Sequence, residues 1–106
     1  MDTTDLLIAA MTERIVARFH PLRIILFGSR GRGDAGPRSD VDLLIVLPQV
    51  SNTRQAALEI RRALADFRVS KDIIVTSPDE VARRGHLVGT VLRPALREGR
   101  VLYERR

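Results

Sequence analysis

The sequence predicts a single domain of the α/β (α+β) class, in which helices pack on a small mixed β-sheet of three to four strands. Short apolar runs rich in Ile, Leu and Val lie at residues 22–27, 41–47 and 69–76, as expected for buried strands. Segments with helical periodicity separate these runs. The 106 residues suffice for one modest core and not for a second large domain, so residues 1–106 are treated as one unit.

The first expected helix covers residues 3–20, with Thr3 or Thr4 as its cap. Pro21 ends it because proline cannot continue a helix. Its apolar side chains recur at helical spacing and form one stripe: Ile8, Met11, Ile15 and Phe19. A buried strand over residues 22–27 follows.

Residues 29–39 hold three glycines and Pro37, which predicts a turn or a very short helix followed by a loop. After the strand at 41–47, Ser51 is the expected cap of a helix that runs to about residue 67. The apolar face of this helix contains Ala57, Ile60, Leu64 and Phe67. Its outer face carries Arg54, Arg61 and Arg62, which we interpret as a solvated surface.

The third strand, residues 69–76, is followed by a capping box that predicts a short helix: Ser77, Pro78 and Glu80, with Gly85 as its stop. A further helical segment is expected over residues 87–97. Residues 101–103 are expected to add a short edge strand.

The formal net charge is +5, and arginine supplies nearly all of the positive charge. This balance favours acidic or phosphate-rich partners. The basic residues are scattered and are not interleaved with aromatic residues, so nucleic acid is not expected to be the main partner. Without cysteine, neither a disulfide framework nor a thiolate metal site is possible.

The N-terminal residues are acidic and do not resemble a signal peptide. The apolar run at 43–47 is far shorter than the ~20 residues of a membrane span. We therefore expect a cytoplasmic protein that does not contact the membrane.

Asp40 and Asp42 lie at the entry to the second strand, two residues apart. Residues at this spacing in a strand point to the same face, roughly 6.6 Å apart along the backbone. Carboxylates arranged in this way can converge on hard cations, as in two-metal phosphoryl transfer. Asp72, near the start of the next strand, is the best candidate for a third carboxylate.

Gly28 and Ser29 could form a phosphate cradle, because a glycine at a strand end allows close backbone approach and helix-initiating amides attract anions. Arg30 could reach a phosphate or be a solvated loop residue. Each acidic group also has a simpler interpretation. The Ser-Asp-x-Asp segment could be turn chemistry, and Asp72 could be an exposed strand end paired with Arg68 or Lys71.

The glycines at 31, 33 and 36 match the spacing of a dinucleotide fingerprint, but Pro37 and a new strand follow where a long helix is needed. The order of the remaining features is more specific: a GSxxxG segment, then SDxDL, comprising Gly28, Ser29, Gly33, Ser39, Asp40, Asp42 and Leu43. These motifs resemble the signature of nucleotidyltransferases of the DNA polymerase beta superfamily. The KDIIV strand with Asp72 and the EGRVLYER ending resemble its minimal branch, the MNT domains.

The resemblance implies a polymerase beta-like fold and an antitoxin that works with a HEPN-domain ribonuclease toxin in a hetero-oligomer. It implies that ATP is the substrate, that two Mg²⁺ ions take part, and that AMP is transferred to a tyrosine hydroxyl of the toxin. By matched position, the catalytic and metal-binding residues would be Asp40, Asp42 and Asp72, and the nucleotide-binding residues Gly28, Ser29, Arg30 and Ser39.

Two other functions stay open. The domain could be a binding module that keeps the fold for complex formation, although three retained carboxylates argue against this. It could also transfer a nucleotide to a small molecule or an RNA end, for which a chain of this size offers little room for a pocket. His20 and His86 lack ligand partners at useful spacing, and Tyr103 is expected to anchor the tail.

Overall fold

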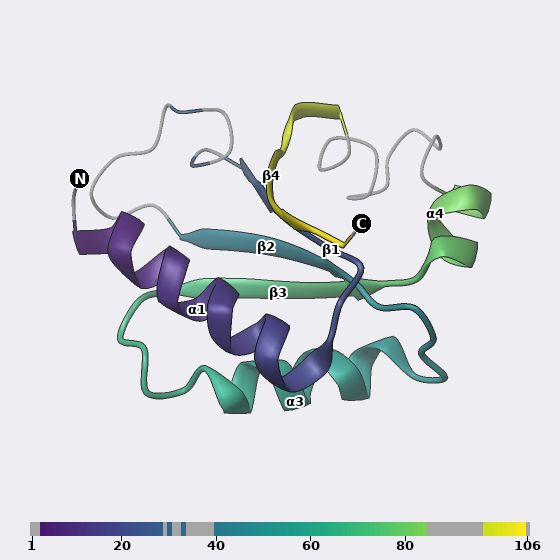
Figure 1. Ribbon diagram of the computed structural model, residues 1–106, viewed down its shortest axis with the longest axis horizontal. Coiled ribbons are helices and arrows are strands. Elements are labelled where there is room, and N and C mark those ends of the chain that lie inside the picture. Colours follow the sequence, from purple (N-terminus) through teal and green to yellow (C-terminus); the bar gives the residue numbers. More distant parts are fainter. Residues whose placement is uncertain (1–2, 29, 31–32, 34–39, 85–96, 106) are drawn as a thin grey trace.

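The computed structural model describes residues 3–28, 30, 33, 40–84 and 97–105 (Figure 1). The elements are α1 (Thr3–Phe19), β1 (Arg23–Phe27), β2 (Val41–Val46), α3 (Thr53–Ala63), β3 (Lys71–Thr76), α4 (Pro78–Arg84) and β4 (Arg100–Glu104). The strands form one four-stranded sheet in the order β3-β2-β1-β4. β1 runs antiparallel to β2 and β4, whereas β2 and β3 are parallel. The predicted mixed α/β fold is confirmed.

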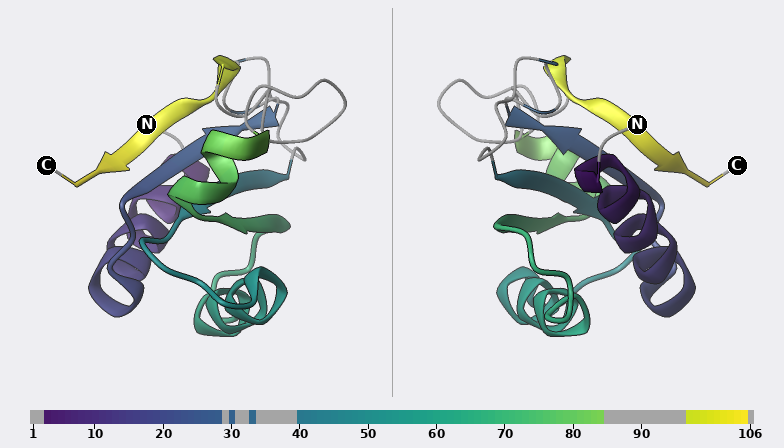
Figure 2. Two further views of the ribbon diagram at one scale, coloured as in Figure 1. Left: turned by 90° about the vertical axis from the view of Figure 1, so that its right-hand side faces the viewer. Right: turned by 90° about the vertical axis from the view of Figure 1, so that its left-hand side faces the viewer.

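Helices α1 and α3 cover the same side of the sheet (Figures 1 and 2). Their apolar stripes meet alternate residues of the strands in one core, because successive strand residues point to opposite faces. The buried residues of this core are Ile8, Met11, Ile15, Ile24, Leu26, Val41, Leu43, Ile45, Leu47, Ile60, Leu64, Ile73 and Val75. The two expected helical stripes are therefore largely confirmed as core-facing.

The intervening strand residues lie on the opposite face of the sheet. There Ile25 and Leu44 are buried, with Phe27 and Ile74 packed against them. By the same alternation, Asp42 and Asp72 belong to this second face, which α1 and α3 leave uncovered. The candidate site is thus separated from the main core by the thickness of the sheet.

Two element boundaries differ from expectation. The cap of α3 is Asn52 and not Ser51: Asn52 has extended backbone angles, and its side-chain oxygen accepts a hydrogen bond from the Gln55 amide at 3.0 Å. The helix also ends at Ala63 rather than near residue 67, because the backbone leaves the helical region at Leu64. The expected helix stop at Gly85 and most of the expected helix over residues 87–97 lie outside the described residues.

Arg14 ties α1 to the end of α3. Its guanidinium donates to the Ala63 carbonyl at 3.0 Å, pairs with Asp66 and lies 4.5 Å from the centre of the Phe67 ring. Farther along the chain, α4 begins as expected, with the Glu80 amide donating to the Ser77 hydroxyl at 3.3 Å. In the described part of the chain, no helix combines the length and the apolar character that crossing a membrane requires.

Candidate active site

The turn after β1 brings a glycine against an aspartate. Gly28 has a φ of 69°, in the left-handed region that favours glycine. The antiparallel register of β1 and β2 places Phe27 opposite Asp42, so Gly28 lies just beyond this pair. A Cβ atom on Gly28 would come within 2.3 Å of the Asp42 Oδ2 atom. The backbone conformation therefore favours glycine, and a Cβ would fit only if the Asp42 carboxylate moved away from the Gly28 backbone.

Asp42 and Asp72 are nearest neighbours across the parallel β2–β3 pair, where they occupy matching register positions. Neighbouring strands are about 4.8 Å apart, so both side chains leave the sheet side by side on one face. Asp40 is exposed and precedes β2 by one residue, two positions before Asp42. The structure thus brings Asp42 and Asp72 together and places Asp40 at the edge of the same region.

The electrostatics of Asp42 reflect this grouping. Partial burial, followed by the negative charges of Asp72 and Asp40, raises the pKa of the Asp42 carboxyl above its ordinary value. The ionised form of Asp42 is therefore penalised by the other two candidate acids. A cation placed among them would relieve this repulsion.

Asp72 also contacts a basic residue from the other side of the sheet. Its Oδ1 atom lies 3.6 Å from Nη2 of Arg61, a residue of α3. The same Arg61 nitrogen donates to the Lys71 carbonyl at 3.2 Å. The alternative pairing with Lys71 is wrong, since the Lys71 ammonium donates instead to the carbonyls of Phe67 and Val69. Asp72 instead pairs with Arg61, which is exposed as predicted for the outer face of α3.

The donor set suits a hard divalent cation, because carboxylate oxygens are the ligands that Mg²⁺ prefers. Within the described segments, however, no three acidic or histidine side chains are gathered closely enough to hold a metal ion as they stand. A bound ion would have to offset both the repulsion among the acids and the contact of Asp72 with Arg61. An ion shared by all three carboxylates would compete with Arg61 for Asp72.

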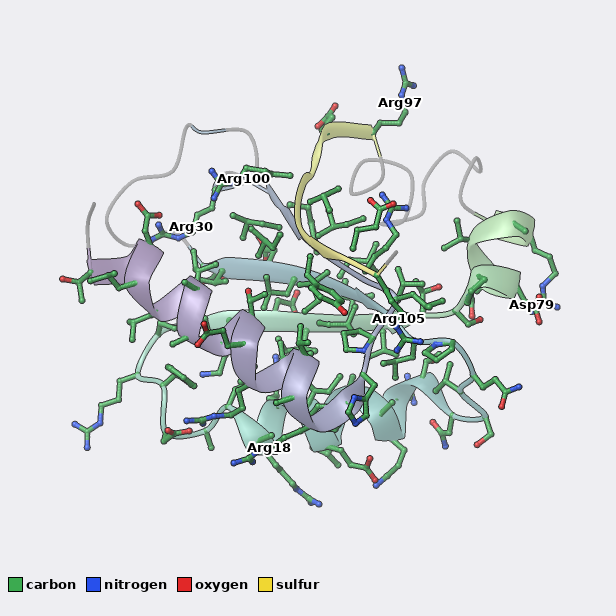
Figure 3. The ribbon with its side chains drawn as sticks, in the orientation of Figure 1. Arg18, Arg30, Asp79, Arg97, Arg100 and Arg105 are labelled. Atoms are coloured by element: carbon green, nitrogen blue, oxygen red, sulfur yellow. The ribbon has the colours of Figure 1, made fainter. Side chains whose placement is uncertain are left out.

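Arg30 lies on the α1 side of β1. It lines a cavity of about 180 Å³ together with Asp5, Ile8, Leu26, Gly33 and Arg100. In Figure 3, Arg30 and Arg100 are labelled near the N-terminal end of α1. Leu26 and Ile8 belong to the main core, and neither Asp42 nor Asp72 is among the residues that line this cavity. Ser29 and Ser39 lie outside the described residues.

Solved structures with the same fold include a protein from Sulfolobus solfataricus assigned to the nucleotidyltransferases. It has a TM-score of 0.67 and 24% sequence identity over 94% of this chain and 79% of the other. A second is a toxin–antitoxin structure with AMP-PNP, with a TM-score of 0.61 and 21% identity over 92% of this chain and 73% of the other. A search of curated proteins found no match to the chain.

The sequence of residues 9–91 matches the nucleotidyltransferase domain as a family model. This segment includes β1, the Gly28 turn, both strand aspartates and α3. The fold and the carboxylates beside the Gly28 turn are consistent with this match. The chain therefore belongs to the nucleotidyltransferase domain family.

Proposed function

We propose that the protein is a Mg²⁺-dependent nucleotidyltransferase that acts as an antitoxin, transferring AMP from ATP to a tyrosine hydroxyl of a HEPN-domain ribonuclease toxin. The observation that carries the proposal is the in-register pair of Asp42 and Asp72 on one face, with Asp42 against the Gly28 turn. Membership of the nucleotidyltransferase family and the fold shared with a toxin–antitoxin structure support it. Nucleotidyltransferases use a nucleoside triphosphate and a divalent metal, which the three acidic side chains suit.

In the proposed reaction, the tyrosine oxygen bonds to the α-phosphorus of ATP as the bond to the β-phosphate oxygen breaks, and pyrophosphate leaves. Two bound Mg²⁺ ions would supply charge neutralisation for the triphosphate and the leaving group. Asp40, Asp42 and Asp72 would hold these ions. Asp72 is the candidate that accepts the hydroxyl proton, a necessary task because tyrosine is a weak nucleophile at neutral pH. The Gly28 turn, with Ser29 and Ser39 as proposed further contacts, would bind the phosphates.

The test is label transfer from α-labelled ATP to the protein encoded by the neighbouring reading frame, with Mg²⁺ present. Asp42→Ala should reduce transfer at least about 100-fold, because it removes an acid that would hold the metal. Asp79→Ala is the matched control, since Asp79 is exposed on α4, which follows the end of β3 opposite to the end that carries Asp72. Transfer that survives Asp40→Ala and Asp42→Ala alike would refute the assignment of these two acids.

One contact favours a second candidate, a binding antitoxin without catalysis. Asp72, the proposed third acid, is paired with Arg61. If the wild-type protein neutralises the neighbouring gene product but transfers no label at any Mg²⁺ or Mn²⁺ concentration, this second function is supported. If neutralisation requires ATP and is lost in Asp42→Ala, the enzymatic function is supported.

A further inference from the structure

A surface groove runs between α3 and the edge strand β3. Its volume is about 270 Å³, and its lining residues are Arg54, Ala57, Leu58, Arg61, Asp72 and Ile73. β3 is the outermost strand on this side of the four-stranded sheet. The groove therefore follows a free edge of the described sheet and is not a gap inside the core.

The helical wall of the groove has a simple sequence basis. Arg54, Leu58 and Arg61 are spaced i, i+4 and i+7, so they form one stripe along α3. Leu58 is 42% exposed, one of the few large apolar side chains of the described surface with such exposure. The stripe thus presents an apolar side chain between two guanidinium groups.

The groove ends at the candidate active site. Arg61 contacts Asp72 at 3.6 Å, and Asp72 is in register with Asp42 on the opposite face of the sheet from α3. A chain segment lying in the groove would therefore pass the sheet edge at Asp72 and reach the carboxylate face. Arg61 also donates to the Lys71 carbonyl, so a partner that added a strand at this edge would have to share or displace that hydrogen bond.

The geometry points to this groove as the docking site for the acceptor protein, through a segment that carries acidic side chains and one apolar side chain next to the modified hydroxyl. This inference rests on the proposed function, because it assumes that the acceptor is a protein. The apolar side chain packs on Leu58, and the acidic side chains pair with Arg54 and Arg61. A carboxylate of the acceptor replaces Asp72 as the partner of Arg61, which leaves Asp72 available to the reacting groups.

The lining favours a protein segment over the alternatives. Single-stranded RNA is bound by stacking its bases on aromatic side chains, and the residues that line this groove include no aromatic one. A second copy of the chain is disfavoured because its formal net charge of +5 would approach a basic groove. An acidic segment from another protein that also carries an apolar side chain is complementary to the positive charge of Arg54 and Arg61 and to the apolar side chain of Leu58.

The test is fluorescence anisotropy of labelled peptides with the full chain, without ATP or metal. The two probes have equal length and a central tyrosine and leucine, and differ only in glutamate or lysine at the flanking positions. We expect the glutamate peptide to bind about 10-fold more tightly than the lysine peptide, and Arg54→Glu to remove most of this preference. Equal binding of the two peptides, or no measurable binding of the glutamate peptide, overturns the proposal.

Arg62→Glu is the matched control. It makes the same charge change on the same helix, but Arg62 shares a different stripe with Gln55 and Glu59 and does not line the groove. It should weaken glutamate-peptide binding less than twofold. If Arg62→Glu weakens binding as much as Arg54→Glu does, the effect comes from the net charge of the protein. The groove is then excluded as the peptide-binding site.

Two further measurements separate the outcomes. If an oligoribonucleotide displaces the peptide and loses affinity in Arg54→Glu, or if Arg54→Glu abolishes self-association in sedimentation, the protein-docking assignment is overturned. Peptide binding should be retained in Asp42→Ala, since docking needs no catalysis. Two outcomes distinguish the docking site from the proposed activity. If peptides bind in the groove but no label is transferred, the nucleotidyltransferase activity is refuted and the docking site is still supported. If label is transferred to the neighbouring gene product and the KM for that acceptor is unchanged in Arg54→Glu, the docking role of the groove is refuted and the activity is still supported.

Discussion

Gly28→Ala tests the site through a single methyl group. The added Cβ would stand 2.3 Å from Asp42 Oδ2, whereas carbon and oxygen ordinarily stay at least about 3.3 Å apart. The atom in the way is the far end of a side chain, so the Asp42 carboxylate can yield by about 1 Å at little cost in stability. Displacement of a catalytic group by this distance costs about 100-fold in rate. We expect a loss of that size in label transfer.

Gly33→Ala is the matched control, because Gly33 has a φ of 83° and a Cβ there would meet no atom of the described residues within 4 Å. Alanine in the left-handed region costs about 1–2 kcal/mol at either position. Both variants should therefore lose roughly 5–10 °C of melting temperature. Only Gly28→Ala should also lose transfer activity about 100-fold, with Gly33→Ala within a few-fold of the wild type.

Two assays read out the comparison: label transfer from α-labelled ATP, and Mn²⁺ binding followed by electron paramagnetic resonance, which needs no acceptor. Gly28→Ala should weaken Mn²⁺ binding more than Gly33→Ala does. The reasoning is refuted if the two variants have equal transfer rates and equal Mn²⁺ affinities at matched stability. In that case the contact between Gly28 and Asp42 would have no role in positioning the carboxylate.

Three further substitutions test the electrostatics. Asp42→Asn should stabilise the fold at pH 7 by about 0.5 kcal/mol after solvent screening, or roughly 2–4 °C, because burial and the neighbouring acids raise the pKa of Asp42 and penalise its ionised form. The stability difference between Asp42→Asn and the wild type should vanish as the pH falls and Asp42 is protonated. Calorimetry at several pH values tests this, and a stability difference that grows at low pH would contradict the prediction. Arg14→Ala should lower stability by about 1–2 kcal/mol through loss of the Ala63 hydrogen bond and the Phe67 ring contact. The pairing of Arg14 with Asp66 adds a pH-dependent contribution to this loss. Because a hydrogen bond from Arg14 lowers the pKa of Asp66, that contribution should be present above the ordinary carboxyl pKa and disappear as the pH falls through the lowered one. Arg61→Ala should increase Mn²⁺ affinity about two- to fivefold by releasing Asp72, and unchanged affinity would refute competition between Arg61 and the metal.

Local rules were reliable where one short stretch of sequence decides the outcome. The stripe of Ile8, Met11 and Ile15 is buried as its spacing predicts, and the capping box at Ser77 begins α4. The cap of α3 was missed because Ser51 and Asn52 are both good caps. Only the backbone angles of the chain entering the helix, which depend on how α3 packs below the sheet, select Asn52.

The candidate site shows the same division. Strand spacing predicts that Asp40 and Asp42 share a side of the sheet, and in the structure Asp40 lies one residue before β2. The sequence also predicts a glycine at the strand end, where it allows close backbone approach. The sequence could not predict which atom contacts Gly28, because that atom depends on the antiparallel register of β1 and β2. The identity of that atom, Asp42 Oδ2, turns a general expectation about glycine into a specific contact.

Local sequence patterns suffice to predict a mixed α/β fold, a glycine turn, and acidic residues at the starts of two apolar strands. These features follow from covalent geometry and local periodicity, which act over a few residues. The register of Asp72 with Asp42, and the contact of Arg61 with Asp72 around the edge of the sheet, depend instead on long-range packing. Strand order and register are set by burying the apolar faces of distant segments together, and no local pattern in the chain encodes that choice.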